Sequence, residues 1–252
     1  MPCALVLSAG GMFGAYQAGA CRVLAEAFRP DLIVGASAGA LNAWALAGGC
    51  SPAELIATWH DPALADLMRL RFPALPWRGV FDPAPLVRHV DDLFARFRPR
   101  VPYGTTLVEV PRLRPVLVRG EQMTAAHLRA SCAIPFGFPP VKIGGKWYVD
   151  GGLLAVVPLW AAVKMGATSA VVVNALPMMP SRFLRATVGV FRAVAAPRVR
   201  FPNIDVIEIR PPGPLGSVGD ALHWKEENVR RWVTRGEQDA AAAVSRLCSL
   251  LP

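Results

Sequence analysis

Residues 31–46 read DLIVGASAGALNAWAL, and this stretch decides the fold. It begins with a short apolar run that is typical of a buried strand, and the alanine-rich residues from Ala38 onward favour a helix. Between them the chain must turn tightly, and Gly35 and Gly39 allow this because they carry no side chain. A G-x-S-x-G turn between a strand and a helix is typical of a nucleophile elbow. The sequence therefore predicts Ser37 as a nucleophile, with a simple helix-capping serine as the alternative.

A second turn of small residues lies near the start of the chain, where residues 4–17 read ALVLSAGGMFGAYQ. It also follows a predicted strand and opens a predicted helix, so both turns should lie at the same edge of a parallel sheet. The backbone N–H groups of Gly10, Gly11 and Met12 would then form an oxyanion hole beside the serine. A dinucleotide-binding turn is disfavoured, because Ala9 stands at its first glycine position and the second strand ends without a carboxylate.

A third motif closes the stretch ASCAIPFGFPPVKIGGKWYVDGGL, residues 130–153, in which Asp150 ends a predicted strand and precedes two glycines. Alone, such an Asp-Gly-Gly is usually a turn. The three motifs in this order resemble those of the patatin-like phospholipase family, and the resemblance covers about residues 4–160. The resemblance implies a lipid acyl hydrolase with a Ser-Asp dyad, no histidine, no cofactor and no metal ion.

What the resemblance implies for individual residues follows from the matching motifs. Ser37 is the nucleophile, Asp150 the general base, and Gly10, Gly11 and Met12 the oxyanion hole. The base is expected to be desolvated, because an ordinary aspartate with a pKa of about 4 is too weak. The chain departs from the family where three glycines, one residue and a basic residue are usual. It has Ala9 at the first glycine position and Phe13 at the basic position.

Other functions fit the same motifs. A Ser-Asp-His triad would use His223, but the α/β-hydrolase fold places several strands before its nucleophile and this chain has room for one. We therefore expect His223 and the other histidines, His60, His89 and His127, to be structural. An acyltransferase at the same site, or a lipid-binding protein with weak or no activity, remains open because a fold does not fix a function.

The rest of the chain alternates short apolar strands with helical patterns, which predicts a three-layer α/β/α fold with a mainly parallel sheet. We expect one domain, 1–252, with its motifs in about 4–160 and a helical continuation in about 175–252. Residues from about 61 to 106 are rich in proline, arginine and aromatic residues, which favours an inserted cap or lid.

The composition of the chain indicates which kinds of partner to expect. The 252 residues carry a net charge of +9, and 23 of the 27 basic residues are arginine, so an anionic partner is expected. Five scattered cysteines favour neither disulfides nor a metal site. The first residues do not resemble a signal peptide. We expect a cytoplasmic protein that acts on lipid or phospholipid and contacts membranes peripherally, with no nucleic-acid partner; the oligomeric state stays open.

One segment is expected to mediate that membrane contact. Residues 181–194 read SRFLRATVGVFRAV, and a helix there would place Arg182, Arg185 and Arg192 on one side and apolar residues on the other. No acidic residue lies between Asp150 and Asp205. A basic amphipathic helix of this kind is typical of docking on anionic lipid, and a helix packed on the sheet is the alternative.

Overall fold

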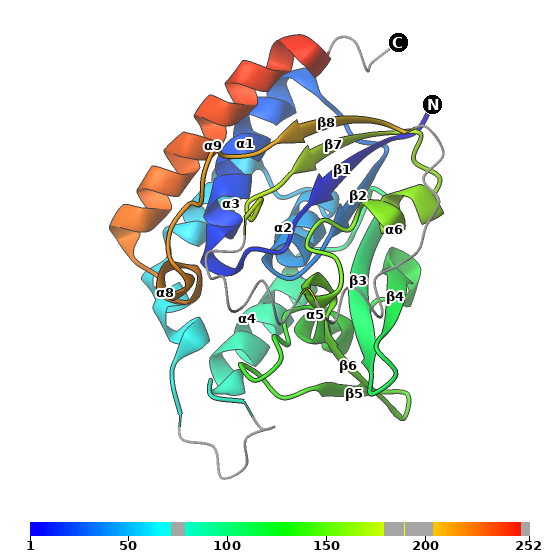
Figure 1. Cartoon of the computed structure of the whole chain (residues 1–252), viewed down its shortest axis with the longest axis vertical. Coiled ribbons are helices and arrows are strands. Elements are labelled where there is room, and N and C mark those ends of the chain that lie inside the picture. Colours follow the sequence, from blue (N-terminus) through cyan, green and yellow to red (C-terminus); the bar gives the residue numbers. More distant parts are fainter. Residues whose placement is uncertain (72–78, 179–188, 190–203, 248–252) are drawn as a thin grey trace.

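The computed structural model describes residues 1–71, 79–178, 189 and 204–247 (Figure 1). Its eight described strands form one sheet in the order β5-β6-β3-β2-β1-β7-β8, with β4 paired to β3. Strands β3, β2, β1, β7 and β8 run parallel, whereas β4, β5 and β6 pair antiparallel. The strands are β1 Cys3–Leu7, β2 Leu32–Gly35, β3 Tyr103–Val110, β4 Arg114–Arg119, β5 Val141–Ile143, β6 Lys146–Asp150, β7 Ser169–Val173 and β8 Asp205–Ile209.

Helices lie on both faces of the sheet, and short 3-10 turns follow several strands. The α-helices are α1 Gly14–Ala27, α2 Ala38–Ala47, α3 Pro52–Trp59, α4 Pro83–Arg96, α5 Ala125–Ser131, α6 Leu159–Lys164, α8 Val218–Leu222 and α9 Glu226–Leu247. The 3-10 helices are η1 Gly11–Phe13, η2 Pro62–Met68, η4 Gly120–Gln122 and η5 Gly151–Leu153.

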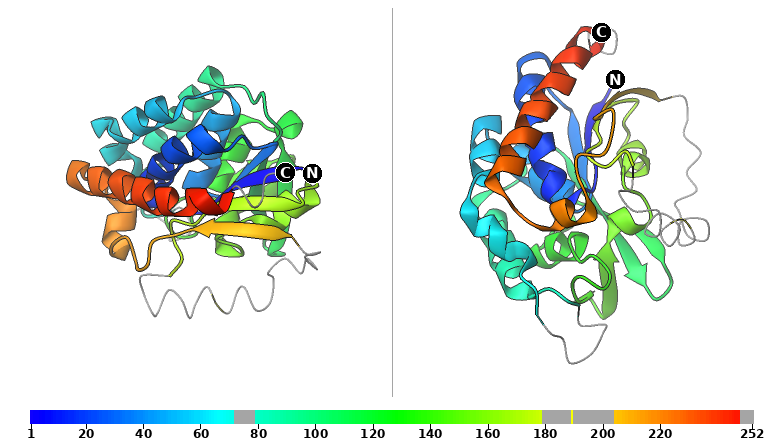
Figure 2. Two further views of the ribbon diagram at one scale, coloured as in Figure 1. Left: turned by 90° about the horizontal axis from the view of Figure 1, so that it is seen from above. Right: turned by 60° about the vertical axis from the view of Figure 1, so that its left-hand side comes forward.

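Strand β1 shows how the layers form, because its side chains alternate between the two faces. Leu5 and Leu7 enter the larger core beneath α1, α2 and α9, and Ala4 and Val6 enter a smaller core beneath α6. Figure 2 shows the sheet edge-on with α1, α2 and α9 on one side. The predicted α/β/α fold with a mainly parallel sheet is confirmed.

The described residues of the segment expected as an insertion, about 61–106, contain η2, α4 and the start of β3. Strand β3 begins at Tyr103, in the middle of the sheet, and the described elements before it in this segment are η2 and α4. Phe81 in this segment is buried, with 5% of its surface exposed, and its ring packs against Phe138. The composition of this segment therefore does not tell which of its aromatic side chains are buried.

The described end of the chain, within the helical continuation expected at about 175–252, contains two separate helices, α8 and α9. Ser217 caps α8 in a capping box with Asp220, and the helix ends because His223 is extended, with φ −117° and ψ 123°. The Trp224 indole N–H then donates to the Trp59 carbonyl, 2.9 Å away, and α9 starts afresh at Glu226. The break thus lets Trp224 contact the end of α3.

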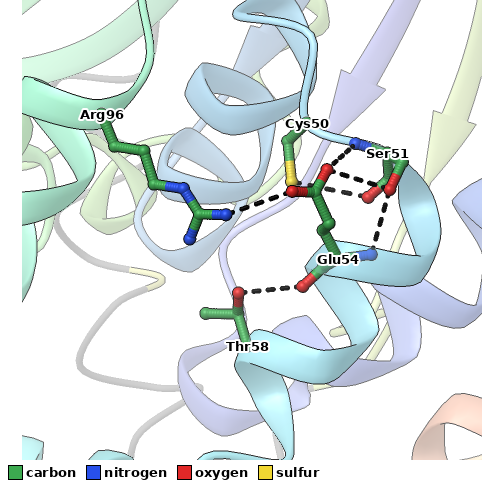
Figure 3. Close-up of polar contacts among 5 residues, drawn as sticks. All are labelled: Cys50, Ser51, Glu54, Thr58 and Arg96. Atoms are coloured by element: carbon green, nitrogen blue, oxygen red, sulfur yellow. Dashed lines mark hydrogen bonds and ion pairs between the residues drawn. The ribbon is translucent and has the colours of Figure 1, made fainter.

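Helix α3 is fixed at its start by polar contacts (Figure 3). The Ser51 hydroxyl accepts from the Glu54 N–H at 3.2 Å, and the Glu54 carboxylate accepts from the Ser51 N–H at 2.9 Å. The same carboxylate receives a hydrogen bond of 3.1 Å from Arg96 at the end of α4. This capping box sets where α3 begins and joins it to α4.

Two features of the described chain bear on membrane contact. No helix within the described ranges is both long and apolar enough to cross a bilayer. The proposed docking helix at 181–194 lies outside the described residues, apart from Gly189.

Candidate active site

Ser37 lies in the turn between β2 and α2 and has an unusual backbone conformation. Its φ is 55°, a left-handed value that is rare for a residue other than glycine, and its side chain is 4% exposed. Small neighbours are required, because a Cβ on Gly35 would lie 2.2 Å from the Gly39 carbonyl oxygen. A Cβ on Gly39 would lie 2.4 Å from the Ser8 carbonyl oxygen. The serine is therefore held in a strained turn that packs directly on the turn after β1.

Asp150 ends strand β6 and is buried, with 5% of its surface exposed. Its backbone N–H donates to the Ala133 carbonyl at 3.0 Å, and its Oδ1 accepts from the Gly152 N–H at 2.7 Å. Burial raises the pKa of the carboxyl to about 6, although hydrogen bonds from the Ser37 side chain and the Gly152 backbone act in the opposite direction. The carboxyl therefore lies near enough to Ser37 for the serine to affect its pKa, which burial places well above the ordinary value for an aspartate.

Strand β3 brings the two residues together. Gly35 of β2 pairs with Thr105, and Asp150 of β6 pairs with Leu107, two residues further along β3. Because β4 occupies the other edge of β3 along this stretch, β2 and β6 share one edge and approach each other end to end. The carboxyl end of β2 therefore faces the carboxyl end of β6, with the serine turn between them.

The glycine-rich turn lies at the same place. Gly11 and Met12, in η1, line a cavity together with Ser37. Gly11 needs to be glycine, because its φ is 57° and a Cβ would lie 2.3 Å from the Ala221 carbonyl oxygen of α8. Gly10 has extended backbone and is not among the residues lining the cavity. The structure thus brings Gly11 and Met12 next to Ser37 and places Gly10 one residue away.

The cavity is small and almost wholly apolar. Its volume is about 40 Å³, room for roughly three water molecules. Besides the serine and the glycine turn, its walls are Ala38, Leu41, Trp59, Leu67, Met68, Leu86, Cys132, Ile134 and Phe138. Cys132 also lies near the carboxylate: burial, followed by the charge of Asp150, raises the pKa of its thiol to about 12. Such a site suits a short length of hydrocarbon next to the serine.

A buried polar chain that sequence analysis missed holds one wall of this cavity. The Trp59 indole N–H donates to Asn42 at 3.0 Å, and the Asn42 amide donates to Gln17 at 3.0 Å. The Gln17 amide donates in turn to the Ser8 carbonyl at 2.7 Å. The sequence signals were Gln17 among small and apolar residues in the first half of α1 and Asn42 as the one polar side chain of α2. The chain fixes Trp59 relative to both small-residue turns.

Phe13, which stands where the family usually has a basic residue, points into the core. It is 1% exposed, and its ring meets Trp232 of α9 edge-on with centroids 5.0 Å apart. A guanidinium in this position would be buried against an indole without water. The position thus supports packing of α9 rather than charge at the cavity.

The histidines lie away from the cavity walls. The ring of His60 contacts Glu226 at 2.9 Å, His127 contacts Thr124 in the cap of α5, and His223 contacts the Gly219 carbonyl at 2.9 Å. Desolvation lowers the pKa of His89. None of the four is among the residues lining the cavity. Within the described part of the chain, no cluster of histidine, cysteine and carboxylate side chains could hold a metal ion.

The fold and the site define an α/β protein with a serine and a titratable carboxyl in contact beside an apolar cavity. A family model described as Patatin-like phospholipase matches residues 5–163, and the chain belongs to this family. Family and fold together support lipid hydrolase activity.

Individual relatives are distant. An uncharacterised protein of Bacillus subtilis strain 168, YqhO, is 29% identical over 188 residues, which cover 62% of this chain and 65% of that protein. The chain thus spans less than two thirds of this relative. The crystal structure of VipD from Legionella pneumophila superposes with a TM-score of 0.54 at 14% identity, covering 97% of this chain and 67% of that one. This likeness concerns the fold alone.

A second solved structure, the type III effector protein ExoU, gives a TM-score of 0.45 at 16% identity. The superposition covers 97% of this chain and 53% of that one. This score is too low to support a conclusion.

Proposed function

We propose that the chain is a serine lipid acyl hydrolase, of phospholipase A or esterase type, that works through a Ser37–Asp150 dyad and needs no cofactor. The observation that carries the proposal is the position of Asp150 next to the serine turn, in a buried site where burial raises the pKa of the carboxyl to about 6 and the Ser37 side chain acts to lower it. A carboxyl that titrates there is ionised at neutral pH and still accepts a proton from an attacking hydroxyl.

The acylation step follows from this contact. The Asp150 carboxylate takes the proton of the Ser37 hydroxyl while the oxygen attacks the ester carbonyl. The carbonyl oxygen becomes an oxyanion, to which the backbone N–H groups around Gly10, Gly11 and Met12 donate. When the intermediate collapses, the bond to the alcohol breaks, and the alcohol leaves with the proton held by Asp150. An acyl ester on Ser37 remains.

Deacylation repeats the step with water. Asp150 takes a proton from a water molecule, whose oxygen attacks the acyl carbonyl and releases the carboxylic acid, and the proton returns to the Ser37 oxygen. An alcohol in place of water would make the reaction an acyl transfer by the same route. The positive end of α2 faces Ser37 and favours the negative charge in both steps.

The substrate is a lipid or phospholipid ester, reached by transient contact of a cytoplasmic protein with an anionic membrane. The apolar cavity walls and the net charge of +9 support both parts of this proposal. Turnover of a soluble short-chain p-nitrophenyl ester tests the chemistry, and covalent labelling by an organophosphate tests the nucleophile. We expect both in the wild-type protein and neither in Ser37→Ala. Analysis of lipids incubated with each protein then distinguishes free fatty acid from a transferred acyl group.

Ester turnover in Ser37→Ala at the wild-type rate would contradict the proposal. A wild-type protein that binds lipid vesicles without any turnover would identify a lipid-binding protein instead.

A further inference from the structure

Three large apolar side chains are exposed on neighbouring segments beside the cavity. Leu70 is 67% exposed, Val80 41% and Phe136 74%. The Arg71 N–H donates to the Val80 carbonyl at 2.8 Å, and the Val80 N–H donates to the Phe136 carbonyl at 3.0 Å. These backbone contacts place the three segments side by side, and we call their exposed side chains, Leu70, Val80 and Phe136, the apolar platform.

The apolar platform adjoins the cavity walls. Ile134 and Phe138 line the cavity, and Phe136 between them is exposed, so one short segment builds both surfaces. Met68 lines the cavity as well, two residues before Leu70. The segments are packed closely, since a Cβ on Gly79 would lie 2.4 Å from the Gly137 carbonyl oxygen. Apolar surface therefore continues from the cavity wall to the outside of the protein.

Phe136 is strained as well as exposed. Its φ is 65°, a left-handed value that a bulky residue adopts only at a cost of about 1–3 kcal/mol. Burial offsets none of this cost, because three quarters of the residue faces solvent. An aromatic ring in this position does little for the folded chain alone, which points to a contact made with something else.

We infer that the apolar platform is the surface by which the protein docks on a phospholipid bilayer, with its side chains in the boundary between headgroups and acyl chains. The inference rests on the proposed lipid substrate. An acyl chain that passes from a bilayer to Ser37 through water would expose each methylene at a cost of about 0.8 kcal/mol. A platform inserted in the bilayer beside the cavity removes that exposure.

A bilayer fits the apolar platform better than a protein partner does. Stable protein interfaces use about 20–30 residues on each side and complementary shape. Three described side chains fall far short of this number, whereas insertion into lipid requires no complementary shape. Arg69, beside Leu70, is paired with Asp82 but keeps 58% of its side chain exposed. An arginine there can reach lipid phosphate.

Vesicle binding by an apolar-platform variant tests the inference. We expect the double variant Leu70→Ser/Phe136→Ser to bind phosphatidylcholine vesicles containing phosphatidylglycerol about tenfold to a hundredfold more weakly than wild type. The loss should persist at high salt, because apolar insertion is not screened. Docking through the arginines of residues 181–194 would instead disappear with salt.

Matched variants separate docking from folding and chemistry. Val206 is as exposed as Val80, 41% each, but lies near the start of β8, at the far end of the parallel strands from Ser37. We therefore expect Val80→Ser to weaken vesicle binding and Val206→Ser to leave it unchanged. Phe136→Gly should weaken binding while raising the melting temperature, because glycine tolerates the left-handed backbone. A purely structural Phe136 would not give this combination.

The outcomes also separate the inference from the proposed function. Normal turnover of a soluble ester by the platform variants, with weaker vesicle binding, supports both. Weaker binding of variants of a protein that hydrolyses no ester supports docking and contradicts the hydrolase. Vesicle binding by the double variant equal to wild type overturns the inference, and so does a change in oligomeric state with unchanged binding.

Discussion

A hydrogen-bonding interaction with the Ser37 side chain lowers the pKa of the buried Asp150 carboxyl, although the two residues come from the ends of strands that run in opposite directions. Their contact depends on β3, which pairs with Gly35 and with Asp150 along the same edge. Burial raises the pKa of the carboxyl to about 6, and the hydrogen bond limits that rise. In the proposed mechanism, this interaction affects the chemistry, the pH dependence and part of the stability.

The first prediction is that Ser37 and Asp150 act as one unit. We expect Ser37→Ala and Asp150→Asn each to abolish ester turnover, and the double variant to be scarcely slower than either single variant. His223→Ala is the control, because the His223 ring contacts only a carbonyl of its own helix in the described contacts and should leave turnover near wild type. Most of the activity surviving in Asp150→Asn would remove the dyad, and a thousandfold loss in His223→Ala would restore the triad.

The second prediction is the pH dependence of kcat/KM. A general base works only when ionised, so kcat/KM should be low below pH 6, rise through an apparent pKa of about 6 and level off above it. An ordinary aspartate would place this rise near pH 4. Rates for a soluble ester between pH 4 and 9 measure it. A midpoint near pH 4 would mean that Asp150 is solvated during turnover.

The local strand, turn and helix at each motif could be predicted from the sequence. The approach of Ser37 to Asp150 was expected only from the resemblance to a known family. The strand, turn and helix around Ser37 follow from local preferences, since small residues and an apolar run leave few alternatives. The contact with Asp150 depends on β2 and β6 sharing one edge of β3, and this long-range register leaves no pattern in the sequence. The polar residues Gln17 and Asn42 were passed over because each looks isolated on its own helix.

The third prediction concerns stability. Between pH 4 and 6 the folded protein binds more protons at Asp150 than the unfolded chain, so stability falls as pH rises through this window. Above pH 6 the ionised, buried Asp150 carboxyl lowers the free energy of unfolding by an amount of the order of 3 kcal/mol, for a shift of about two pKa units. Asp150→Asn should therefore raise the melting temperature at pH 8 but not at pH 4, despite the loss of turnover.

The control for this prediction is Asp82→Asn. The hydrogen bond with Arg69 and that with the Ala84 N–H lower the pKa of Asp82, so its ionised form favours folding. That contribution to stability is present above the pKa that Asp82 has in the unfolded chain, and it is lost as the pH falls through the lower pKa of the folded protein. Asp82→Asn should therefore not raise the melting temperature at pH 8. Thermal unfolding at both pH values compares the two variants, and a destabilised Asp150→Asn at pH 8 would contradict the prediction.

The fourth prediction is that Gly39→Ala disrupts the serine turn. The added Cβ would lie 2.4 Å from the Ser8 carbonyl and 2.6 Å from the Leu7 carbonyl, and both are backbone atoms that cannot swing aside. Crowding of this kind costs about 1–3 kcal/mol, so we expect lower turnover and a melting temperature several degrees lower. Gly213→Ala is the control, since its Cβ would meet no atom within 4 Å. Equal turnover and stability of both variants would contradict the role of close packing.

The fifth prediction is that Trp59 limits the length of the acyl chain. The indole is one wall of the cavity of about 40 Å³, and the chain of hydrogen bonds through Asn42 and Gln17 keeps it from swinging away. Trp59→Leu should enlarge the cavity at the cost of that hydrogen bond. The preference among p-nitrophenyl esters should then move toward longer chains, seen in kcat/KM from acetyl to octanoyl.

A matched pair of leucines separates cavity size from loss of stability. Leu86 lines the cavity at 7% exposure, and Leu55 of α3 is buried at 3% but is not among the lining residues. Both truncations to alanine should cost about 2–5 kcal/mol, since both leave a void in the core. Only Leu86→Ala should shift the chain-length preference in the direction of Trp59→Leu, because only its void adjoins the path from Ser37. A shift in Leu55→Ala of the same size would mean that general loosening of the fold, and not the cavity wall, sets the acyl chain length.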